Sequence, residues 1–277
     1  MAMNSKGQWH PIHENHAIAV MAAAVTFAEP LTSVVYRKFL QAAEEAAFNA
    51  GLKSRHVTGN LQFKVGSDGR PIPQRSDQNY GRIFNSTSES DGGASVSEQL
   101  QIEPTSIVYR TWNYTSWGTI LERLAELLSI PLDLAASATT IATIRLEYLD
   151  RFRFDGNISL DDARSALAEK SPWLSPHVYE REGQWHCHTG AFLPVASGKE
   201  WLLQVRVDAT DEPTLDSPVS VPVRWLNIST AFEKRLTDTD LEPVAALQVF
   251  DEFHRPLKGV LEQIISPDLS TRIFLMS

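Results

Sequence analysis

A stretch of strict alternation at residues 139–154 constrains the fold of this chain more than any other feature of its sequence. One parity carries mainly apolar side chains, whereas the other carries four charged ones: Arg145, Glu147, Arg151 and Arg153. Successive side chains of a β-strand point to opposite faces of its sheet, so the pattern predicts a strand with one apolar and one charged face. A sheet built around such a strand is covered on one side only.

The order of predicted elements is the same in the two parts of the chain. The first part is expected to contain a strand at 17–27, a helix at 33–50, strands at 61–65, 80–84 and 106–112, and a helix at 116–128. The second part is expected to contain a strand at 139–154, a helix at 160–169, strands at 185–192, 201–208 and 219–228, and a helix at 241–265. Both parts therefore read β-α-β-β-β-α.

This matched order predicts an α+β fold built from two similar halves, residues 1–130 and 131–277. We expect the halves to form a largely antiparallel sheet, or two adjoining sheets, with the helices packed on one side. Unless the match is a coincidence of coarse patterns, residues 1–130 and 139–265 should superpose about an approximate two-fold axis.

Two prolines and one polar stretch carry more specific expectations. Pro131 is predicted to end the helix at 116–128, and Pro256 is predicted to kink or break the last helix near Arg255, because an internal proline removes a backbone hydrogen bond. The stretch at 85–104 is rich in Ser, Thr, Glu and Gly, which indicates a long exposed loop or an edge strand.

Composition narrows the class of protein. The 277 residues include 25 Lys and Arg against 34 Asp and Glu, and the resulting net charge of −9 disfavours binding to nucleic acid or to an anionic membrane. The apolar run at 17–27 is too short to span a bilayer and has no basic leader, so it indicates a buried strand rather than a signal peptide. Cys187 is the only cysteine, which fits a reducing cytosol.

The sequence lacks both glycine-rich phosphate-binding motifs, and it lacks the signatures of serine hydrolases and of zinc proteases. We therefore expect no cofactor, and we name no catalytic residue. Two histidine groups are weak candidates for a metal site. His10, His13 and His16 recur at every third residue, although a polar N-terminal segment explains them as well. His186 and His188 are predicted to share a face of a strand, but two ligands do not close a zinc site, so we expect no stoichiometric metal.

The charged parity of the strand at 139–154 is the main candidate for a binding surface. Arginine presents a planar fork of donors that suits carboxylates and phosphates, so the candidate binding residues are Arg145, Glu147, Arg151 and Arg153. A ladder of cross-strand ion pairs would explain the same residues structurally. The seven tryptophans indicate core packing and interface anchoring rather than a surface for stacking bases.

Four loose motifs run through nearly the whole chain: VTFAEPL at 25–31, YTSWGTILERL at 114–124, IRLEYLDRF at 144–152 and FDEFHRPLKGVLEQII at 250–265. Through them the chain resembles a sporadically distributed, functionally uncharacterised family of bacterial proteins of similar length. The central pattern of that family is approximately Arg-x-x-x-Tyr-x-Asn. Arg145 and Tyr148 keep a similar frame, whereas Asp150 stands where the family has an amide. The resemblance implies a cytosolic bacterial protein and no assigned activity.

The sequence favours a non-catalytic cytosolic protein that recognises a protein or a ligand through the open face of its sheet. We expect a protein partner, with a homodimer among the options, and neither a membrane nor nucleic acid. Sporadic occurrence of the similar proteins suggests an accessory role such as defence against mobile elements. Two alternatives stay open: a small-molecule-binding domain with a pocket between the sheet and the C-terminal helix, and an enzyme of a class that the motifs do not reveal.

Overall fold

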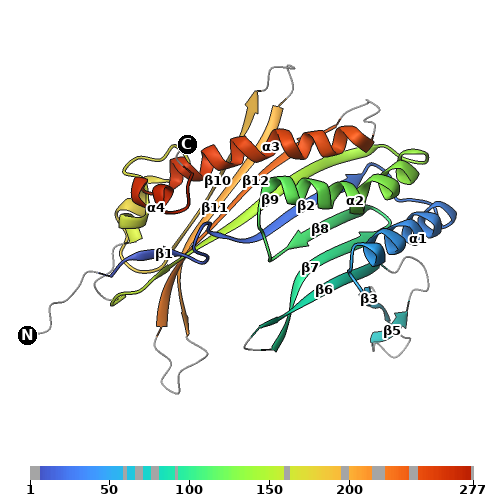
Figure 1. Cartoon of the computed structure of the whole chain (residues 1–277), viewed down its shortest axis with the longest axis horizontal. Coiled ribbons are helices and arrows are strands. Elements are labelled where there is room, and N and C mark those ends of the chain that lie inside the picture. Colours follow the sequence, from blue (N-terminus) through green and yellow to red (C-terminus); the bar gives the residue numbers. More distant parts are fainter. Residues whose placement is uncertain are drawn as a thin grey trace, which may run out of the picture. The chain divides into compact units, whose positions relative to one another are not determined.

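The structure is a computed structural model of the 277-residue chain (Figure 1). It describes residues 7–58, 61–65, 71–75, 81–90, 93–158, 163–194, 200–213, 222–236 and 243–275. Within these ranges the fold is α+β, with a largely antiparallel sheet and helices packed on one side of it, as the sequence predicts.

Ten strands of the described part form one sheet, in the order β10-β11-β12-β9-β2-β8-β7-β6-β3, with β1 paired to β9. Their bounds are β1 Trp9–Pro11, β2 Ile18–Phe27, β3 Ser54–Thr58, β6 Gly81–Ser90, β7 Gly93–Glu103, β8 Ser106–Thr111, β9 Ile141–Phe154, β10 Trp185–Pro194, β11 Glu200–Pro213 and β12 Pro222–Arg235. A separate two-stranded sheet pairs β4 (Leu61–Val65) with β5 (Pro71–Arg75).

The helices are α1 Ser33–Asn49, α2 Trp117–Ala136, α3 Pro243–Ile264 and α4 Pro267–Arg272, and the 3-10 helices are η1 Ala163–Ala166 and η2 Pro176–Tyr179. The chain divides into two compact units. Unit 1 comprises Met1–Met21, Leu146–Lys234 and Glu252–Ser277, and unit 2 comprises Ala22–Arg145 and Arg235–Asp251. Strands β2, β9 and β12 and helix α3 therefore contribute residues to both units.

Four strands follow the same order in the two predicted halves, but the first half also contains β3, β4 and β5, which have no counterpart among the described strands of the second half, and the strand expected at 61–65 lies in the separate sheet. In the first half β2 lies beside β8, and β7 and β6 follow; in the second half β9 lies beside β12, and β11 and β10 follow. In each half the last strand of a three-stranded meander returns to the side of the first strand. The superposition of residues 1–130 on residues 139–265 stays a prediction.

In unit 2, α1 and α2 pack against each other, and α1 also contacts β6 and β7. Fully buried side chains come from both layers: Phe39 of α1, Leu124 of α2, and Leu100 of β7 are examples. Helix α2 begins where the sequence predicts, because the hydroxyl of Ser116 accepts a hydrogen bond from the backbone N–H of Thr119 and so caps the first turn.

In unit 1, an aromatic cluster joins the sheet to the C-terminal part of α3. The ring of Phe253 from α3 lies 4.9 Å from the ring of Trp201 and 5.6 Å from the ring of Phe232, measured between centroids. A hydrogen bond of 2.9 Å between the hydroxyl of Tyr148 and Nδ1 of His254 links β9 to the same helix. These contacts identify the helix-covered face of the sheet in unit 1.

Both prolines lie within continuous helices, so the predicted end at Pro131 and the predicted break near Arg255 are wrong, whereas the kink near Arg255 stays a prediction. Helix α2 continues past Pro131, which is buried together with Leu132, and this burial offsets the lost hydrogen bond. Helix α3 continues past Pro256. Pro256 and Glu252, whose carbonyl loses its helical donor, are both exposed residues.

The Ser-rich stretch at 85–104 forms strands rather than a long loop, and part of it is an edge, because β3 pairs with β6 only at residues 81–85 and residues 86–90 pair with β7 alone among the described strands. The stretch forms most of the hairpin of β6 and β7, and β7 is an inner strand between β6 and β8. Leu100 and Ile102 of β7 are fully buried. Polar residues alternate with these two and dominate the composition of the stretch, so its composition alone does not indicate a strand.

The helix predicted at 160–169 is the short 3-10 helix η1 in the described part, and residues 159–162 lie outside the described residues. The backbone of this segment bonds partly to itself, as from the N–H of Leu167 to the carbonyl of Arg164, and partly to the end of α3. Ala168 N–H donates to the carbonyl of Ile264, and Ser266 N–H donates to the carbonyl of Ala166. These bonds take the groups that a longer helix would need.

An ion pair ties the helices of unit 2 to the sheet of that unit. Arg123 of α2 donates from Nη2 to Glu98 Oε2 of β7 at 2.7 Å and to the carbonyl of Ala50, just after α1. Tyr109 of β8 donates its hydroxyl proton to Glu98 Oε1 at 2.6 Å. Burial raises the pKa of Glu98, but the hydrogen bonds from Arg123 and Tyr109 outweigh burial and hold that pKa below its usual value.

We predict that Arg123→Ala lowers the free energy of unfolding by about 2–4 kcal/mol, because it leaves the Glu98 carboxylate in a half-buried place without its cation. Urea denaturation followed by circular dichroism measures the change. Arg55→Ala is the matched control, since the 2.6 Å pair of Arg55 with Glu44 lies in the same unit but is exposed, and its loss should cost less than about 1 kcal/mol. Equal effects of the two variants would contradict the assignment.

Candidate binding face

The face of the unit 1 strands that points away from the helices carries most of the candidate binding residues, and we call it the open face of unit 1. Strand register assembles it: His186 of β10 lies opposite Asp208 of β11, which lies opposite Asn227 of β12. Arg206 on this face has a side chain that is 60% exposed, whereas the neighbouring Val207 points the other way and is fully buried. The open face comprises Glu147, Arg151, Arg153, His186, His188, Phe192, Gln204, Arg206, Asp208, Glu212, Trp225, Asn227 and Ser229.

Arg151 is held by three side chains from the neighbouring strands. Its Nε donates to Oδ1 of Asn227, and its Nη2 donates to Oε1 of Glu212, both at 2.7 Å. Its guanidinium carbon lies 4.2 Å from the centroid of the Trp225 ring, which is a cation–π contact. Charge-assisted hydrogen bonds and stacking together fix the planar fork in one orientation.

Other charged groups of the open face are paired as well. Ser229 donates its hydroxyl proton to Oε1 of Glu147 at 2.8 Å. Asp208 accepts hydrogen bonds from Nδ1 of His186 and from Nε of Arg206, the latter at 2.9 Å. The polar side chains of this face therefore hold one another in defined positions.

The four predicted binding residues lie on one face of β9, since the residues that alternate with them are buried. Arg145 belongs to unit 2 and is half-buried. Glu147 and Arg151 take part in the cross-strand pairing that was the structural alternative, whereas Arg153 is exposed. Arg153 is therefore the member of the set that a partner reaches without breaking a contact of the fold.

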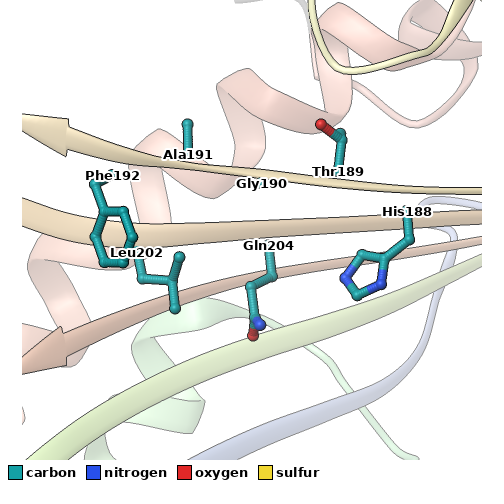
Figure 2. A pocket seen from close by; sticks show the side chains of 7 residues that line it. All are labelled: His188, Thr189, Gly190, Ala191, Phe192, Leu202 and Gln204. Carbon is teal, nitrogen blue, oxygen red and sulfur yellow. The ribbon is translucent and has the colours of Figure 1, made fainter.

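A pocket of about 350 Å³ lies at the edge of the sheet, on β10 and β11 (Figure 2). Figure 2 shows the side chains of Thr189 and Ala191 on one side of these strands and four others on the opposite side: His188, Phe192, Leu202 and Gln204. Gly190 lies between His188 and Phe192, and a Cβ added to it would come within 2.6 Å of the carbonyl oxygen of Leu203. Phe192 is 55% exposed.

The strand histidines have the geometry that the sequence predicts. His186 and His188 are exposed on the open face of unit 1, and Cys187 between them is buried on the other face. The centroids of the two imidazole rings are 6.4 Å apart. His186 is engaged with Asp208, which also holds Arg206, so this carboxylate already has two cationic or donor partners.

The N-terminal histidines are spread over β1 and the turn after it. His10 bonds to Asp155 at 2.9 Å, whereas the rings of His13 and His16 lie 4.5 Å apart. Within the described ranges, no group of three or more His, Cys, Asp and Glu side chains is placed to hold a metal ion.

The helix-covered face of β9 carries a buried carboxyl group. Asp150 is 2% exposed, and its Oδ1 has no hydrogen-bond partner among the described residues. Burial raises the pKa of Asp150 to about 7. A carboxyl with this pKa is protonated below neutral pH, and the neutral group resembles an amide in size and in its hydrogen-bonding groups. In that form Asp150 can take the place of the amide expected at this position.

Sequence reasoning missed the partners of Arg151 and the exposed aromatic ring at the sheet edge. The alternation at 219–228 places Trp225 and Asn227 on one parity, and this signal was present in the sequence. Which residue of β9 they meet depends on the register between strands, which no local pattern encodes. The predicted strand at 185–192 places Phe192 on the same parity as His186 and His188, and this signal for its exposure was not used.

No protein-family model matches the chain, and no curated protein is similar to it. Among solved structures, the comparison gave the solid-state NMR structure of outer membrane protein AlkL in DMPC lipid bilayers, at 11% sequence identity, over 86% of this chain and 99% of that chain, with a TM-score of 0.12. So low a TM-score supports no inference. The resemblance to the bacterial family stays a prediction. None of the helices in the described ranges combines the length and the apolar character that crossing a membrane requires.

We predict different roles for the two neighbouring arginines of β9. Arg151→Ala should lower the free energy of unfolding by about 1–3 kcal/mol, because it removes two charge-assisted hydrogen bonds and the contact with Trp225. Arg153→Ala should change it by less than about 0.5 kcal/mol, because the side chain is exposed. Urea denaturation measures both, and equal losses would show that the pairing around Arg151 contributes nothing.

A second prediction concerns the protonation of Asp150. Between about pH 4 and pH 7 the carboxyl is ionised in the unfolded chain, where it keeps its ordinary value of 3.8, but protonated in the folded one, so the free energy of unfolding falls as the pH rises through this interval. Above about pH 7 the carboxyl is ionised in the folded chain as well, so the stabilisation that its protonated form gives at lower pH is absent. Asp150→Asn should remove this slope and make the variant more stable than the natural chain at pH 8. Parallel pH profiles of the two proteins in urea denaturation would contradict it.

Proposed function

We propose that the protein is a non-catalytic recognition module that binds a protein partner through the open face of unit 1. The observation that carries the proposal is the placement of Arg151, stacked on Trp225 and hydrogen-bonded to Asn227 and Glu212, on a sheet face that is not the helix-covered one. Arginine and tryptophan are the residues that most often dominate the energy of protein interfaces.

The pairing of side chains on this face supports binding rather than catalysis. Side chains that are already fixed lose little conformational freedom when a partner docks, which lowers the entropic cost of association. Catalytic groups, in contrast, usually have a pKa tuned to their task. In unit 1 the carboxyl with a pKa near 7 is Asp150, and it lies on the opposite, helix-covered face of β9.

The same face favours a protein partner over a small molecule. Its polar and aromatic side chains extend over four strands, β9 to β12, whereas a small ligand is usually enclosed on most sides. The pocket beside Gly190 is near the lower end of ligand-site volumes, and it lies on β10 and β11 rather than between the sheet and α3. The small-molecule alternative therefore has less support than the protein partner.

The chemistry of the partner follows from the exposed charges. Arg153 and Arg206 are exposed cations of this face; the carboxylates of Asp208, Glu147 and Glu212 are engaged in pairs, and Arg206 is itself the exposed partner of Asp208. We propose a partner that presents acidic side chains to Arg153 and Arg206, in a cytosolic setting that suits the single, buried Cys187. An accessory role, such as defence against mobile elements, is compatible with this module.

A site-specific photo-crosslinker tests the proposal. Placed at Arg153 in cells that express the protein, it should capture a defined partner, and placed at the exposed Arg37 of α1 it should not. Arg153→Glu should then abolish binding of the purified partner in calorimetry, with Arg37→Glu as the matched charge reversal that leaves binding intact. Capture of the same proteins from both positions, or binding that survives Arg153→Glu, would overturn the open face as the binding surface.

A further inference from the structure

An arginine of unit 2 is surrounded by neutral amide side chains instead of by a carboxylate. Strand β8 places Arg110 opposite Gln99 of β7. Its neighbour Tyr109 is buried on the side of α2, because Tyr109 and Arg123 of that helix bond to the same carboxylate. Successive side chains of a strand point to opposite faces, so Arg110 lies on the face of β7 and β8 that points away from α2.

Two amide oxygens hold the guanidinium of Arg110 in place. Its Nη1 donates to Oε1 of Gln99 at 3.1 Å and to Oε1 of Gln101 at 2.9 Å. Gln99 in turn donates from Nε2 to Oδ1 of Asn85 at 3.2 Å. Gln101 donates from Nε2 to Oε1 of Glu103 at 2.6 Å. The acceptors on Arg110 carry no charge, so the network orients the guanidinium without neutralising it.

One side of this guanidinium is left for a ligand. Arginine has five N–H donors, and both hydrogen bonds of Arg110 start from Nη1. Among the described residues, none accepts a hydrogen bond from Nε or Nη2 of Arg110, and none forms an ion pair with it. These two nitrogens form a fork that binds a carboxylate through two parallel hydrogen bonds. Arg110 is also half-buried, so its charge has lost part of its hydration without gaining an anion.

The surrounding charges select the kind of anion. A group with one negative charge matches one arginine, and a carboxylate has this charge and the planar shape of the fork. A phosphate carries nearly two charges, and the carboxylate of Glu103 beyond Gln101 and the net charge of −9 both repel it. The amide groups of Gln99 and Gln101 each have a second N–H, which can donate to the main chain beside a bound carboxylate.

We propose that unit 2 binds an acidic segment of a protein, with an Asp or Glu side chain of that segment paired to Nε and Nη2 of Arg110 and its main chain bonded to Gln99 and Gln101. Charge complementarity carries this choice of ligand. The network extends over β6, β7 and β8, which suits an extended segment better than an enclosed small molecule. The site uses none of the residues of the open face of unit 1, so it goes beyond the proposed function.

Heteronuclear NMR of the full chain tests the site, because it records the Nε–H groups of arginines individually. The peptide Gly-Ser-Gly-Glu-Gly-Ser-Gly should shift the signal of Arg110, which is identified by its loss in Arg110→Lys, with a dissociation constant of about 1 mM. The same peptide with glutamine in place of glutamate should leave the signal unchanged. Acetate and inorganic phosphate should bind about tenfold more weakly or worse, since acetate lacks a main chain and phosphate is repelled.

Each of three results would overturn the proposal. A signal of Arg110 that the glutamate peptide does not shift shows that the fork binds no carboxylate. Acetate that binds as tightly as the peptide shows a site for small acids instead of a protein segment. Phosphate that binds more tightly than the peptide shows a site for phosphate groups.

The variant Gln99→Glu supplies the missing anion from within the chain. Its carboxylate accepts the hydrogen bond from Arg110, and Asn85 can turn its amide to donate in place of Gln99, so the contacts of the fold are kept. The variant should unfold at a higher urea concentration than the natural chain, yet bind the glutamate peptide at least about tenfold more weakly.

Gln41→Glu is the matched control, because it makes the same change of charge at an exposed position of α1 in unit 2 and should bind the peptide like the natural chain. Binding that survives Gln99→Glu, or that Gln41→Glu weakens equally, overturns the site. Arg153→Glu should leave the titration of Arg110 unchanged, so the failure of this site and the failure of the proposed function are measured by different variants.

Discussion

The alternation of burial along β9 is the constraint on which unit 1 depends. Every second residue at 146–154 is buried, so one side of the strand has to be covered by apolar groups and the other has to be polar. The polar side becomes an ordered surface because its charges find partners on β11 and β12, as Arg151 does with Glu212 and Asn227. The same constraint explains Asp150, a polar residue on the covered parity whose charge burial disfavours.

Two charged groups of the described residues are compensated by two or more hydrogen bonds each. In unit 2 the Glu98 carboxylate is compensated by Arg123 and Tyr109. In unit 1 the buried Arg224 donates from Nε and Nη2 to the two carboxylate oxygens of Asp211, at 2.7 and 3.0 Å. Such pairs add modestly to the stability of the fold. If one member is removed or misplaced, the other stays buried without its partner, and its desolvation destabilises that arrangement. The pairs therefore disfavour wrong packing.

Local patterns were sufficient to predict most elements and their face of burial, whereas contacts between distant segments were not predictable. The helix expected at 33–50 is α1, Ser33–Asn49, and the strand expected at 139–154 is β9, Ile141–Phe154. Arg151, by contrast, meets Glu212 and Asn227 at separations of 61 and 76 residues, which only strand register determines. The continuity of α2 through Pro131 has the same origin, because the burial that offsets the proline is set by packing rather than by local propensity.

The close approach at Gly190 separates two kinds of requirement on the sequence. A side chain at that position would meet the carbonyl of Leu203 within the same sheet, so glycine is demanded by the chain's own backbone whatever binds outside. Phe192, two residues on, has an exposed side chain. If related sequences keep glycine at position 190 while the residue at 192 varies, the backbone contact between β10 and β11 is kept while the exposed surface at the sheet edge changes.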